Sequence, residues 1–403
     1  MHIIWLTPEF PSSIDNTKGI YIYRTVKELS KHFKITVIAL YPAAPPIMEI
    51  LRYKKDWKKL FKDWKLNYSV ENETKEKDNF KIIYLKYYRL PRNKFHHIEG
   101  WFAYIQLKNK LKTIVSKDSI IHANWIFPAG TLAKIISVKY KIPFIISLMG
   151  SDVNRLIQGS KFWKEADNLL HSANLVTSVA QDLFDQCKNK NIILDKNKTK
   201  LIDNIYETNK FIIKNKNEVR QYLNIKNGIK IILYAGGLIP LKNVDILIEA
   251  VSKLNKSGLL IKLYIAGSGT EEGNLKRLVQ NLNLSDNVIF LGPLIADKLI
   301  DYYNAADLFC LQSKSEGLPN VIVESFLCGT PVVATKVGGI STILKNGENG
   351  FLAEPNSIVD LTEKIQSALS VKWDQNSIRN SISHLFPENV LNNYMKIYNS
   401  LLN

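Results

Sequence analysis

The sequence predicts an α/β protein of two domains, each built around a parallel sheet. The chain has 403 residues, which is more than one hydrophobic core usually serves. Short β-rich apolar runs alternate with longer helical patterns, and this alternation starts again after about residue 205. Strands that are apolar on both faces and alternate with helices are typical of parallel sheets. We find no internal repeat, so the halves should share architecture only.

In the first half, the expected strands are 2–7, 35–40, 81–85, 119–123, 143–148 and 175–179. The helical patterns between them cover 21–33, 103–115, 128–140 and 180–189. In the second half, the expected strands are 230–237, 259–267, 287–292, 307–312 and 330–335.

The polar stretch 203–226 is the expected linker region, which sets the domains at 1–205 and 206–385. The last segment, 386–403, predicts an amphipathic helix with a broad apolar stripe. That stripe contains Val390, Leu391, Tyr394, Met395, Ile397 and Tyr398. Such a helix either caps the second domain or reaches back to the first.

The net charge of +17 and the pI near 9.4 favour anionic partners such as lipid, nucleotide or acidic glycan. No zinc-finger, basic-zipper or RNA-recognition pattern supports a nucleic-acid partner. There is no apolar run of membrane-spanning length and no signal-peptide pattern at the start. Three scattered cysteines fit neither a disulfide framework nor a metal site, so we expect a reducing, cytoplasmic location.

Residues 45–80 fit neither sheet and predict a basic, aromatic insertion in the first domain. Trp57, Leu60, Phe61 and Trp64 recur at helical spacing and are flanked by six lysines. This is the pattern of an amphipathic helix over 51–65 that lies on an anionic membrane surface. The alternative is a helix whose aromatic face packs on its own domain while the lysines stay solvated.

Two carboxylates follow the expected strand 307–312, in the stretch SEGLPNVIVESFLCGTPVVATKVGG. Ligands of parallel sheets bind at the carboxyl ends of the strands. Pro319 fits the first turn of a helix, so Glu316 precedes this helix and Glu324 lies inside it. A helix start attracts phosphate, because its N–H groups are unpaired and carry partial positive charge. Glu316 and Glu324 could then accept hydrogen bonds from hydroxyls on either side of a phosphate group.

Both residues could also have a purely structural role. Glu316 could simply complement the helix dipole, and Glu324 could lie on a surface face. However, the neighbours of Glu324 at 321–323 and 326–327 are almost all apolar, so a solvated face is hard to find. A buried carboxylate needs partners, which favours a functional role for Glu324.

The same stretch, followed by NGENGFL, resembles the retaining glycosyltransferases of family 4. The resemblance covers nearly the whole chain, including PEFPSSIDNTKGIYIYR, HANWIFPAG, SLMGSDVN, YAGGLIPLKNVDILIEA and IAGSGTEEGNL. It implies the GT-B architecture, in which two Rossmann-like parallel-sheet domains face a cleft. The first domain would bind the acceptor and the second the nucleotide-sugar, while the helix at 386–403 would cross back to the first domain.

The resemblance also implies roles for single residues. The implied donor-binding residues are Gly237, Lys242, Gly267, Gly269, Glu316, Gly317, Leu318, Pro319, Asn320 and Glu324. The implied acceptor-side residues are Gly19, His122, Met149 and Asp152, and the implied catalytic residues are Glu316, Lys242 and Asp152. Two alternatives stay open: Asp152 could cap the helix that follows it, and a core role for His122 is favoured over a functional one.

Four positions depart from the family pattern. Gly237 stands where the family usually has an Arg that clasps the diphosphate together with Lys242. The diphosphate would then be held by one flexible lysine ammonium group, in place of a planar arginine guanidinium group and a lysine. Met149 stands where many members have a His that contacts the donor sugar, and Ser341 and Thr342 replace the usual Pro-Glu.

The resulting expectation is a retaining, metal-independent hexosyltransferase without a cofactor. It would move a sugar from a nucleoside-diphosphate donor, with UDP-sugar favoured, to a glycan or lipid-linked acceptor in surface polysaccharide synthesis. The protein would be cytoplasmic and peripheral on the inner membrane face. The alternatives are a non-catalytic nucleotide-sugar-binding or scaffold protein, and a sugar-nucleotide epimerase or phosphorylase, on the same fold.

Overall fold

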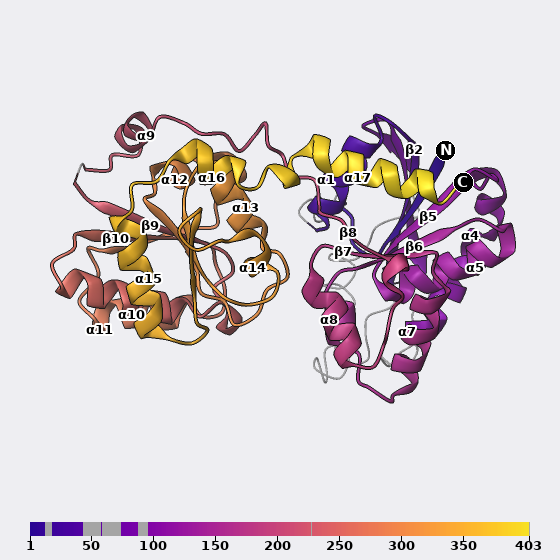
Figure 1. Ribbon diagram of the computed structural model, residues 1–403, viewed down its shortest axis with the longest axis horizontal. Coiled ribbons are helices and arrows are strands. Elements are labelled where there is room, and N and C mark those ends of the chain that lie inside the picture. The colour runs from indigo at the N-terminus through magenta and orange to yellow at the C-terminus, as the bar shows by residue number, and fades with distance from the viewer. Residues whose placement is uncertain (13–17, 43–57, 59–73, 88–95, 227, 403) are drawn as a thin grey trace. The chain divides into compact units, whose positions relative to one another are not determined.

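The computed structural model describes residues 1–12, 18–42, 58, 74–87, 96–226 and 228–402. The helix predicted over 51–65 lies outside these residues, apart from Lys58. The chain forms two compact units, Met1–Tyr206 with Pro387–Asn403, and Glu207–Phe386 (Figure 1). The predicted class, α/β with two Rossmann-like parallel-sheet domains, is confirmed by the sheets of these two units.

The first unit is built on an eight-stranded sheet of order β3-β4-β2-β1-β5-β6-β7-β8. Its strands are β1 (His2–Thr7), β2 (Lys34–Pro42), β3 (Thr74–Lys77), β4 (Phe80–Tyr87), β5 (Ser119–Asn124), β6 (Phe144–Leu148), β7 (Leu175–Ser178) and β8 (Thr199–Leu201). All neighbours pair in parallel except β3, which is antiparallel to β4. The strand order reverses between β1 and β5, as in a doubly wound sheet.

Helices cover both faces of this sheet. They are α1 (Ile20–Leu29), α4 (His96–Ile114), η2 (Ile126–Gly130), α5 (Thr131–Tyr140), α6 (Ser151–Asn154), α7 (Lys161–Ser172), α8 (Gln181–Asn189), η3 (Lys196–Lys198) and α17 (Pro387–Ser400). Alternate residues of a strand point to opposite faces. In β1, Ile4 and Leu6 pack with α4, α5, α7 and α8. Ile3 and Trp5 pack with α1 and α17.

The C-terminal helix α17 belongs to the core of the first unit. Val390, Tyr394 and Tyr398 are buried on the sheet face that carries Trp5, and α17 runs along this unit beside α1 (Figure 1). The helix therefore carries the amphipathic stripe that its sequence predicts, and this stripe packs in the first unit.

The second unit has a six-stranded, fully parallel sheet of order β11-β10-β9-β12-β13-β14. Its strands are β9 (Lys230–Ala235), β10 (Ile261–Ala266), β11 (Val288–Gly292), β12 (Leu308–Leu311), β13 (Val332–Thr335) and β14 (Gly350–Ala353). Counted along the chain, this is the doubly wound order 3-2-1-4-5-6. The order reverses between β9 and β12.

The helices of this unit are α9 (Lys216–Tyr222), η4 (Pro240–Lys242), α10 (Val244–Lys256), α11 (Glu272–Asn281), α12 (Ala296–Ala305), α13 (Asn320–Leu327), α14 (Ile340–Ile343), α15 (Ile358–Ser370), α16 (Gln375–Asn380) and η5 (Ser383–Leu385). Helices α10, α11 and α15 lie on one face of the sheet, and α12, α13 and α16 on the other (Figure 1). Within the described residues of both units, no helix has the length and apolarity needed to cross a membrane.

The packing of α17 leads to a stability prediction. Val390→Ala removes two methyl groups from a fully buried site, so we expect a loss of about 1–3 kcal/mol in the free energy of unfolding. Val359→Ala is the matched control, because Val359 lies in helix α15 and is 61% exposed. Chemical denaturation of both variants measures the difference. Equal stabilities would mean that α17 contributes no core contact.

Candidate functional site

The reversal of strand order in the second unit creates the candidate site. The loops after β9 and β12 leave neighbouring strands at the point of reversal, and ligands of such sheets bind there, at the carboxyl ends of the strands. The first loop holds Gly237 and η4, and it ends at Lys242. The second holds Ser313 and Glu316, and it leads into α13.

An ion pair joins the two loops. Lys242 Nζ lies 2.5 Å from Glu316 Oε1, and the two side chains are only 20% and 11% exposed. Ser313 donates a second hydrogen bond, of 2.6 Å, to the same carboxylate oxygen. The structure thus brings together two residues predicted separately from sequence, and adds Ser313, which sequence reasoning missed.

Backbone hydrogen bonds fix the same two loops. Gln312 Nε2 donates to the carbonyl of Lys242 at 2.9 Å, and the amide of Lys314 donates to Leu241 at 2.8 Å. Thr335, at the end of β13, donates to the carbonyl of Ser313 at 2.6 Å. These hydrogen bonds hold the loops that carry Lys242 and Glu316 next to each other.

Gly267 and Gly269 shape the loop after β9. Gly267 has a φ of +146°, and a Cβ there would lie 1.9 Å from the carbonyl oxygen of Gly236. A Cβ on Gly269 would lie 2.2 Å from the carbonyl oxygen of Leu238. The amides of Gly236 and Leu238 also donate to the loop after β10, each at 2.9 Å. These glycines therefore let the segment around Gly237 pack directly against the loop after β10.

Gly237 itself is exposed, and a Cβ at this position would meet no atom within 4 Å. Its carbonyl accepts a hydrogen bond from the Tyr234 hydroxyl at 2.9 Å. The backbone therefore leaves room for a side chain, although the sequence supplies none. An Arg side chain could begin here without a clash, so the absence of Arg removes a positive charge and does not reflect a lack of space.

A third loop supports Glu316. Gly338 has a φ of +53°, and a Cβ there would lie 1.9 Å from the carbonyl oxygen of Glu316. The amide of Gly339 donates to the carbonyl of Gly317 at 2.8 Å. In the sequence, the glycine pair after the strand 330–335 could have indicated this contact, since adjacent glycines permit a close approach of the backbone.

The remaining predicted donor residues lie at the start of α13. Pro319 occupies the N-cap position and offers no side-chain cap, while Leu318 and Asn320 flank it. The first N–H groups of a helix have no partner within the helix. Glu324 lies in the body of α13, partly buried, and accepts a hydrogen bond from the Tyr303 hydroxyl at 3.3 Å. Burial, together with the charge of Glu324, raises the pKa of Tyr303.

In the first unit, Gly19 precedes α1 with a φ of +67°. A Cβ at this position would lie 2.5 Å from the carbonyl oxygen of Glu9. The start of α1 is therefore held against the loop after β1. Tyr21, in the first turn of α1, donates to the Glu9 carboxylate at 3.4 Å.

Asp152 accepts three backbone hydrogen bonds. Its carboxylate binds the amides of Met149 at 3.1 Å, Val153 at 3.0 Å and Ile126 at 3.2 Å. Burial raises the pKa of Asp152, and these three donors act in the opposite direction. Asp152 lies inside α6, whose N-cap residue is Gly150, so the alternative in which Asp152 caps this helix is wrong. Its contacts instead attach the loop after β6 to the loop after β5.

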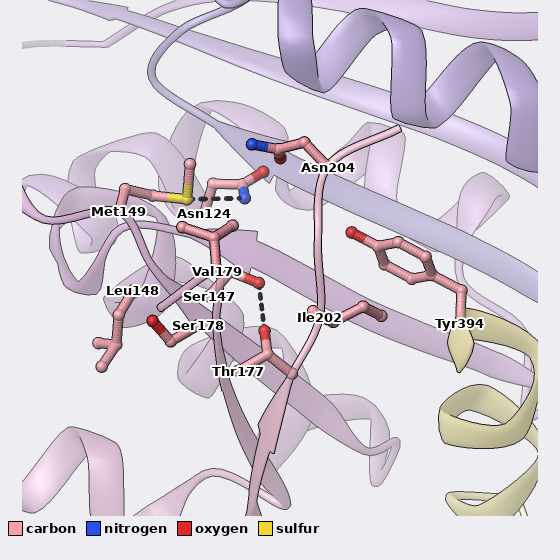
Figure 2. Close-up of a pocket in the computed structure, with 10 residues that line it drawn as sticks. All are labelled: Asn124, Ser147, Leu148, Met149, Thr177, Ser178, Val179, Ile202, Asn204 and Tyr394. Atoms are coloured by element: carbon pink, nitrogen blue, oxygen red, sulfur yellow. Dashed lines mark hydrogen bonds between the residues drawn. The ribbon is translucent and has the colours of Figure 1, made fainter. Parts of the chain in front are cut away.

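His122 is buried within β5, and its ring stacks on Trp5 with centroids 4.1 Å apart. Burial lowers the pKa of His122 to about 3, so the ring is neutral at physiological pH. Met149 lies in the loop after β6, where Asn124 Nδ2 approaches its sulfur at 3.4 Å (Figure 2). His122 thus occupies the core position that the sequence favoured, and Met149 lines a pocket.

The cysteines and acidic residues complete the inventory. Cys187, Cys310 and Cys328 are all free and buried, and burial raises the pKa of each thiol. Among the residues that the structure describes, no three His, Cys, Asp or Glu side chains gather as a metal site.

Comparison with known proteins identifies relatives of this chain. Residues 215–383 match the family described as "Glycosyl transferases group 1". One relative is TuaC of Bacillus subtilis, a glycosyltransferase provisionally assigned to teichuronic acid biosynthesis. It is 28% identical over 377 residues, which cover 91% of this chain and 88% of TuaC. The uncharacterized glycosyltransferase MJ1178 of Methanocaldococcus jannaschii is 31% identical over 261 residues, covering 63% of this chain and 67% of MJ1178.

A solved structure shares the fold over its full length. The crystal structure of Anabaena Alr3699/HepE in complex with UDP superposes with a TM-score of 0.72 and 18% identity, covering 100% of both chains. At this identity the likeness supports the fold alone.

The close approach of Gly338 leads to a second prediction. Gly338→Ala should destabilise the second unit by about 1–3 kcal/mol, because the new Cβ strains a left-handed backbone and collides with Glu316. Gly273→Ala is the matched control, since a Cβ there meets nothing within 4 Å in helix α11. Urea denaturation compares the two. A Gly338→Ala variant as stable as the wild type would refute the proposed packing of these loops.

Proposed function

The chain belongs to the group 1 glycosyl transferases, and from this membership we propose that it moves a sugar from a nucleoside diphosphate to an acceptor hydroxyl. We favour a UDP-sugar as donor and a glycan or lipid-linked acceptor in surface polysaccharide synthesis. The observation that carries the proposal is the Lys242–Glu316 pair at the strand-order reversal, beside the uncapped start of α13.

Two relatives support the details of this proposal. Alr3699/HepE, which shares the fold, was crystallised with UDP, and this supports UDP as the nucleotide. The name of TuaC refers to teichuronic acid biosynthesis, which supports an acceptor in surface polysaccharide synthesis. A lipid-linked acceptor would bring the protein to the cytoplasmic face of a membrane. The basic segment 51–65 would then contact anionic lipid.

The diphosphate would be held by two features of the second unit. The uncapped amides at the start of α13 would donate hydrogen bonds to phosphate oxygens. Lys242 would supply the positive charge, in the absence of an Arg at Gly237. Glu324, within α13, would accept a hydrogen bond from a ribose hydroxyl.

Donor binding would then rearrange the ion pair. In the structure, Lys242 is paired with Glu316. A diphosphate would compete for the ammonium group and free one lone pair of the Glu316 carboxylate. Ser313 would keep that carboxylate in place through its own hydrogen bond. Glu316 would then be free to accept a hydrogen bond from a hydroxyl of the transferred sugar.

We propose a retaining reaction without a metal ion. The bond between the anomeric carbon and the diphosphate oxygen breaks, and the acceptor oxygen attacks from the same face. The acceptor proton passes to the departing diphosphate, so the charges balance without a separate protein base. The protein would contribute orientation of the two substrates and stabilisation of negative charge on the leaving group.

The role of Lys242 can be tested by nucleotide binding. Lys242→Met should weaken UDP binding by about 1.5–3 kcal/mol, because a charged hydrogen bond to phosphate is lost. Lys276→Met is the matched control, since Lys276 also forms an ion pair with a glutamate, Glu272, at 2.7 Å. Calorimetric titration with UDP measures both variants. Equal affinities for the wild type and Lys242→Met would exclude Lys242 from the diphosphate site.

The role of Glu316 can be tested by turnover. Glu316→Gln should slow UDP release from UDP-sugars by about 10- to 100-fold, because the charged hydrogen bond to the sugar is weakened in the transition state. UDP affinity should change much less than turnover. Glu272→Gln is the control from the exposed ion pair. Wild-type turnover in Glu316→Gln would remove Glu316 from the sugar site.

A further inference from the structure

The carbonyl group of Lys242 lies at the end of the short helix η4, and the last carbonyls of a helix have no partner within that helix. The amide of Lys242 donates to the carbonyl of Ile239 at 2.9 Å, which closes the turn. The next residue, Asn243, has a left-handed backbone with a φ of +48°, so the chain changes direction there and α10 begins. The carbonyl of Lys242 therefore needs a donor from another part of the fold.

The side chain of Gln312 supplies this donor. Gln312 directly follows β12, and its Nε2 donates to the carbonyl of Lys242 at 2.9 Å. The amide of Lys314 donates to the carbonyl of Leu241 at 2.8 Å. The loop after β12 thus caps the end of η4 with one side-chain donor and one backbone donor. Because β9 and β12 are neighbours, this contact joins residues that are 70 positions apart.

The other end of the Gln312 amide has no partner. The residue is only 1% exposed, and no donor among the described residues reaches Oε1. A buried acceptor without a donor costs free energy. An apolar side chain would avoid this cost, and the four residues before Gln312 are all buried and apolar. The chain therefore keeps an amide at a position where burial alone favours an apolar side chain.

The orientation of this amide follows from the group that it meets. A backbone carbonyl only accepts hydrogen bonds, whereas a glutamine amide has a donor end and an acceptor end. Turning the Gln312 amide by half a rotation would place Oε1 against the carbonyl oxygen of Lys242, and both atoms are acceptors. The donor end must therefore face Lys242, and the unpaired atom is the oxygen.

Further contacts fix the backbone on both sides of Lys242. Its amide is bound to Ile239 and its carbonyl to Gln312. Asn243 is 5% exposed, and its Nδ2 donates to Asn356 Oδ1, in the loop after β14, at 2.9 Å. The Lys242 ammonium group can then reach only the positions that its side chain spans from a fixed Cα atom.

The carboxylate of the ion pair is positioned from the same loop. Ser313 follows Gln312 in the chain and donates to Glu316 Oε1 at 2.6 Å. The carbonyl of Ser313 in turn accepts from Thr335 at 2.6 Å. Two consecutive residues therefore set the geometry of the pair, since Gln312 holds the backbone of Lys242 and Ser313 holds the carboxylate of Glu316.

We propose that Gln312 is a positioning residue for donor binding, which holds Lys242 where its ammonium group meets the diphosphate. Gln312 makes no contact with the donor, and its effect reaches the phosphates through the backbone of Lys242. The unpaired Oε1 is the consequence of placing a side-chain donor at this buried point. This assignment rests on the proposed function, since it requires that Lys242 binds the diphosphate.

Calorimetric titration with UDP and uridine tests this role. Gln312→Met keeps an unbranched side chain of similar length but can neither donate nor accept an ordinary hydrogen bond. It should weaken UDP binding about fivefold, the loss of one ordinary hydrogen bond, and leave uridine binding unchanged. Gln280→Met, at an exposed position in α11, is the matched control. Wild-type UDP affinity in Gln312→Met, or an equal loss of uridine affinity, would overturn the proposal.

A double-mutant cycle separates positioning from a general effect on the fold. In the background of Lys242→Met, the additional change Gln312→Met should alter UDP affinity less than twofold, because the ammonium group that it positions is absent. The same fivefold loss in both backgrounds would overturn the proposal. Gln312→Leu replaces Gln312→Met if the latter does not fold. Failure of both variants to fold would show a merely structural role and would also overturn it.

The ammonium group of Lys242 gives a measurement that needs no nucleotide. Burial and the bond to Glu316 slow the exchange of its hydrogens with water, which ¹⁵N spectra of lysine side chains follow, and Lys242→Met assigns the signal. In Gln312→Met this exchange should be about fivefold faster. An unchanged exchange rate would overturn the role of Gln312. If the wild type did not bind UDP, the proposed function would fail, and the exchange rate would still decide whether Gln312 positions Lys242.

Discussion

The reversal of strand order between β9 and β12 is the constraint on which the candidate site depends. It sends two loops away from adjacent strands in opposite directions at the carboxyl edge of the sheet. These loops carry one ammonium group and one carboxylate, held 2.5 Å apart and mostly shielded from solvent. Each member of such a pair satisfies the charge of the other. Under the proposed function, a phosphate group would compete with Glu316 for the Lys242 ammonium group.

Close backbone contacts support this arrangement from the neighbouring loops. Gly267, Gly269 and Gly338 each stand where a Cβ would lie 2.2 Å or less from a carbonyl oxygen. They pack the loops after β10 and β13 against those that carry Gly237 and Glu316. In the first unit, side chains make the corresponding contacts. Asp152 joins two loops by accepting hydrogen bonds from backbone amides. A series of hydrogen bonds from Tyr398 through His122 and Ser147 to Thr177 connects α17 to three strands.

The sequence could predict the two parallel sheets, because buried strands and helices alternate along it with clear periodicity. It could also predict that Glu316 and Lys242 each follow a strand. It could not predict their contact, since they are 74 residues apart and meet only because β9 and β12 are neighbours. The partners of Asp152 and His122 were equally inaccessible, because both alternatives for each residue fit the same local pattern. Strands β3, β8 and β14 were missed. Residues 45–80 were expected to fit neither sheet, but β3 pairs with β4 at the edge of the first sheet, through a mostly charged run that carries no apolar signal. Strand β8 is largely exposed, and β14 begins at a glycine.

The central claim is that the second unit holds a nucleoside diphosphate chiefly through its phosphates. Calorimetric titration of the wild-type protein with UDP, UMP and uridine tests it most directly, with GDP and ADP as controls for the base. The account predicts that UDP binds at least tenfold more tightly than UMP, and that uridine binds most weakly, because Lys242 and the start of α13 act on the phosphates. Equal binding of UDP and uridine, or no binding of any of the five compounds, would contradict it.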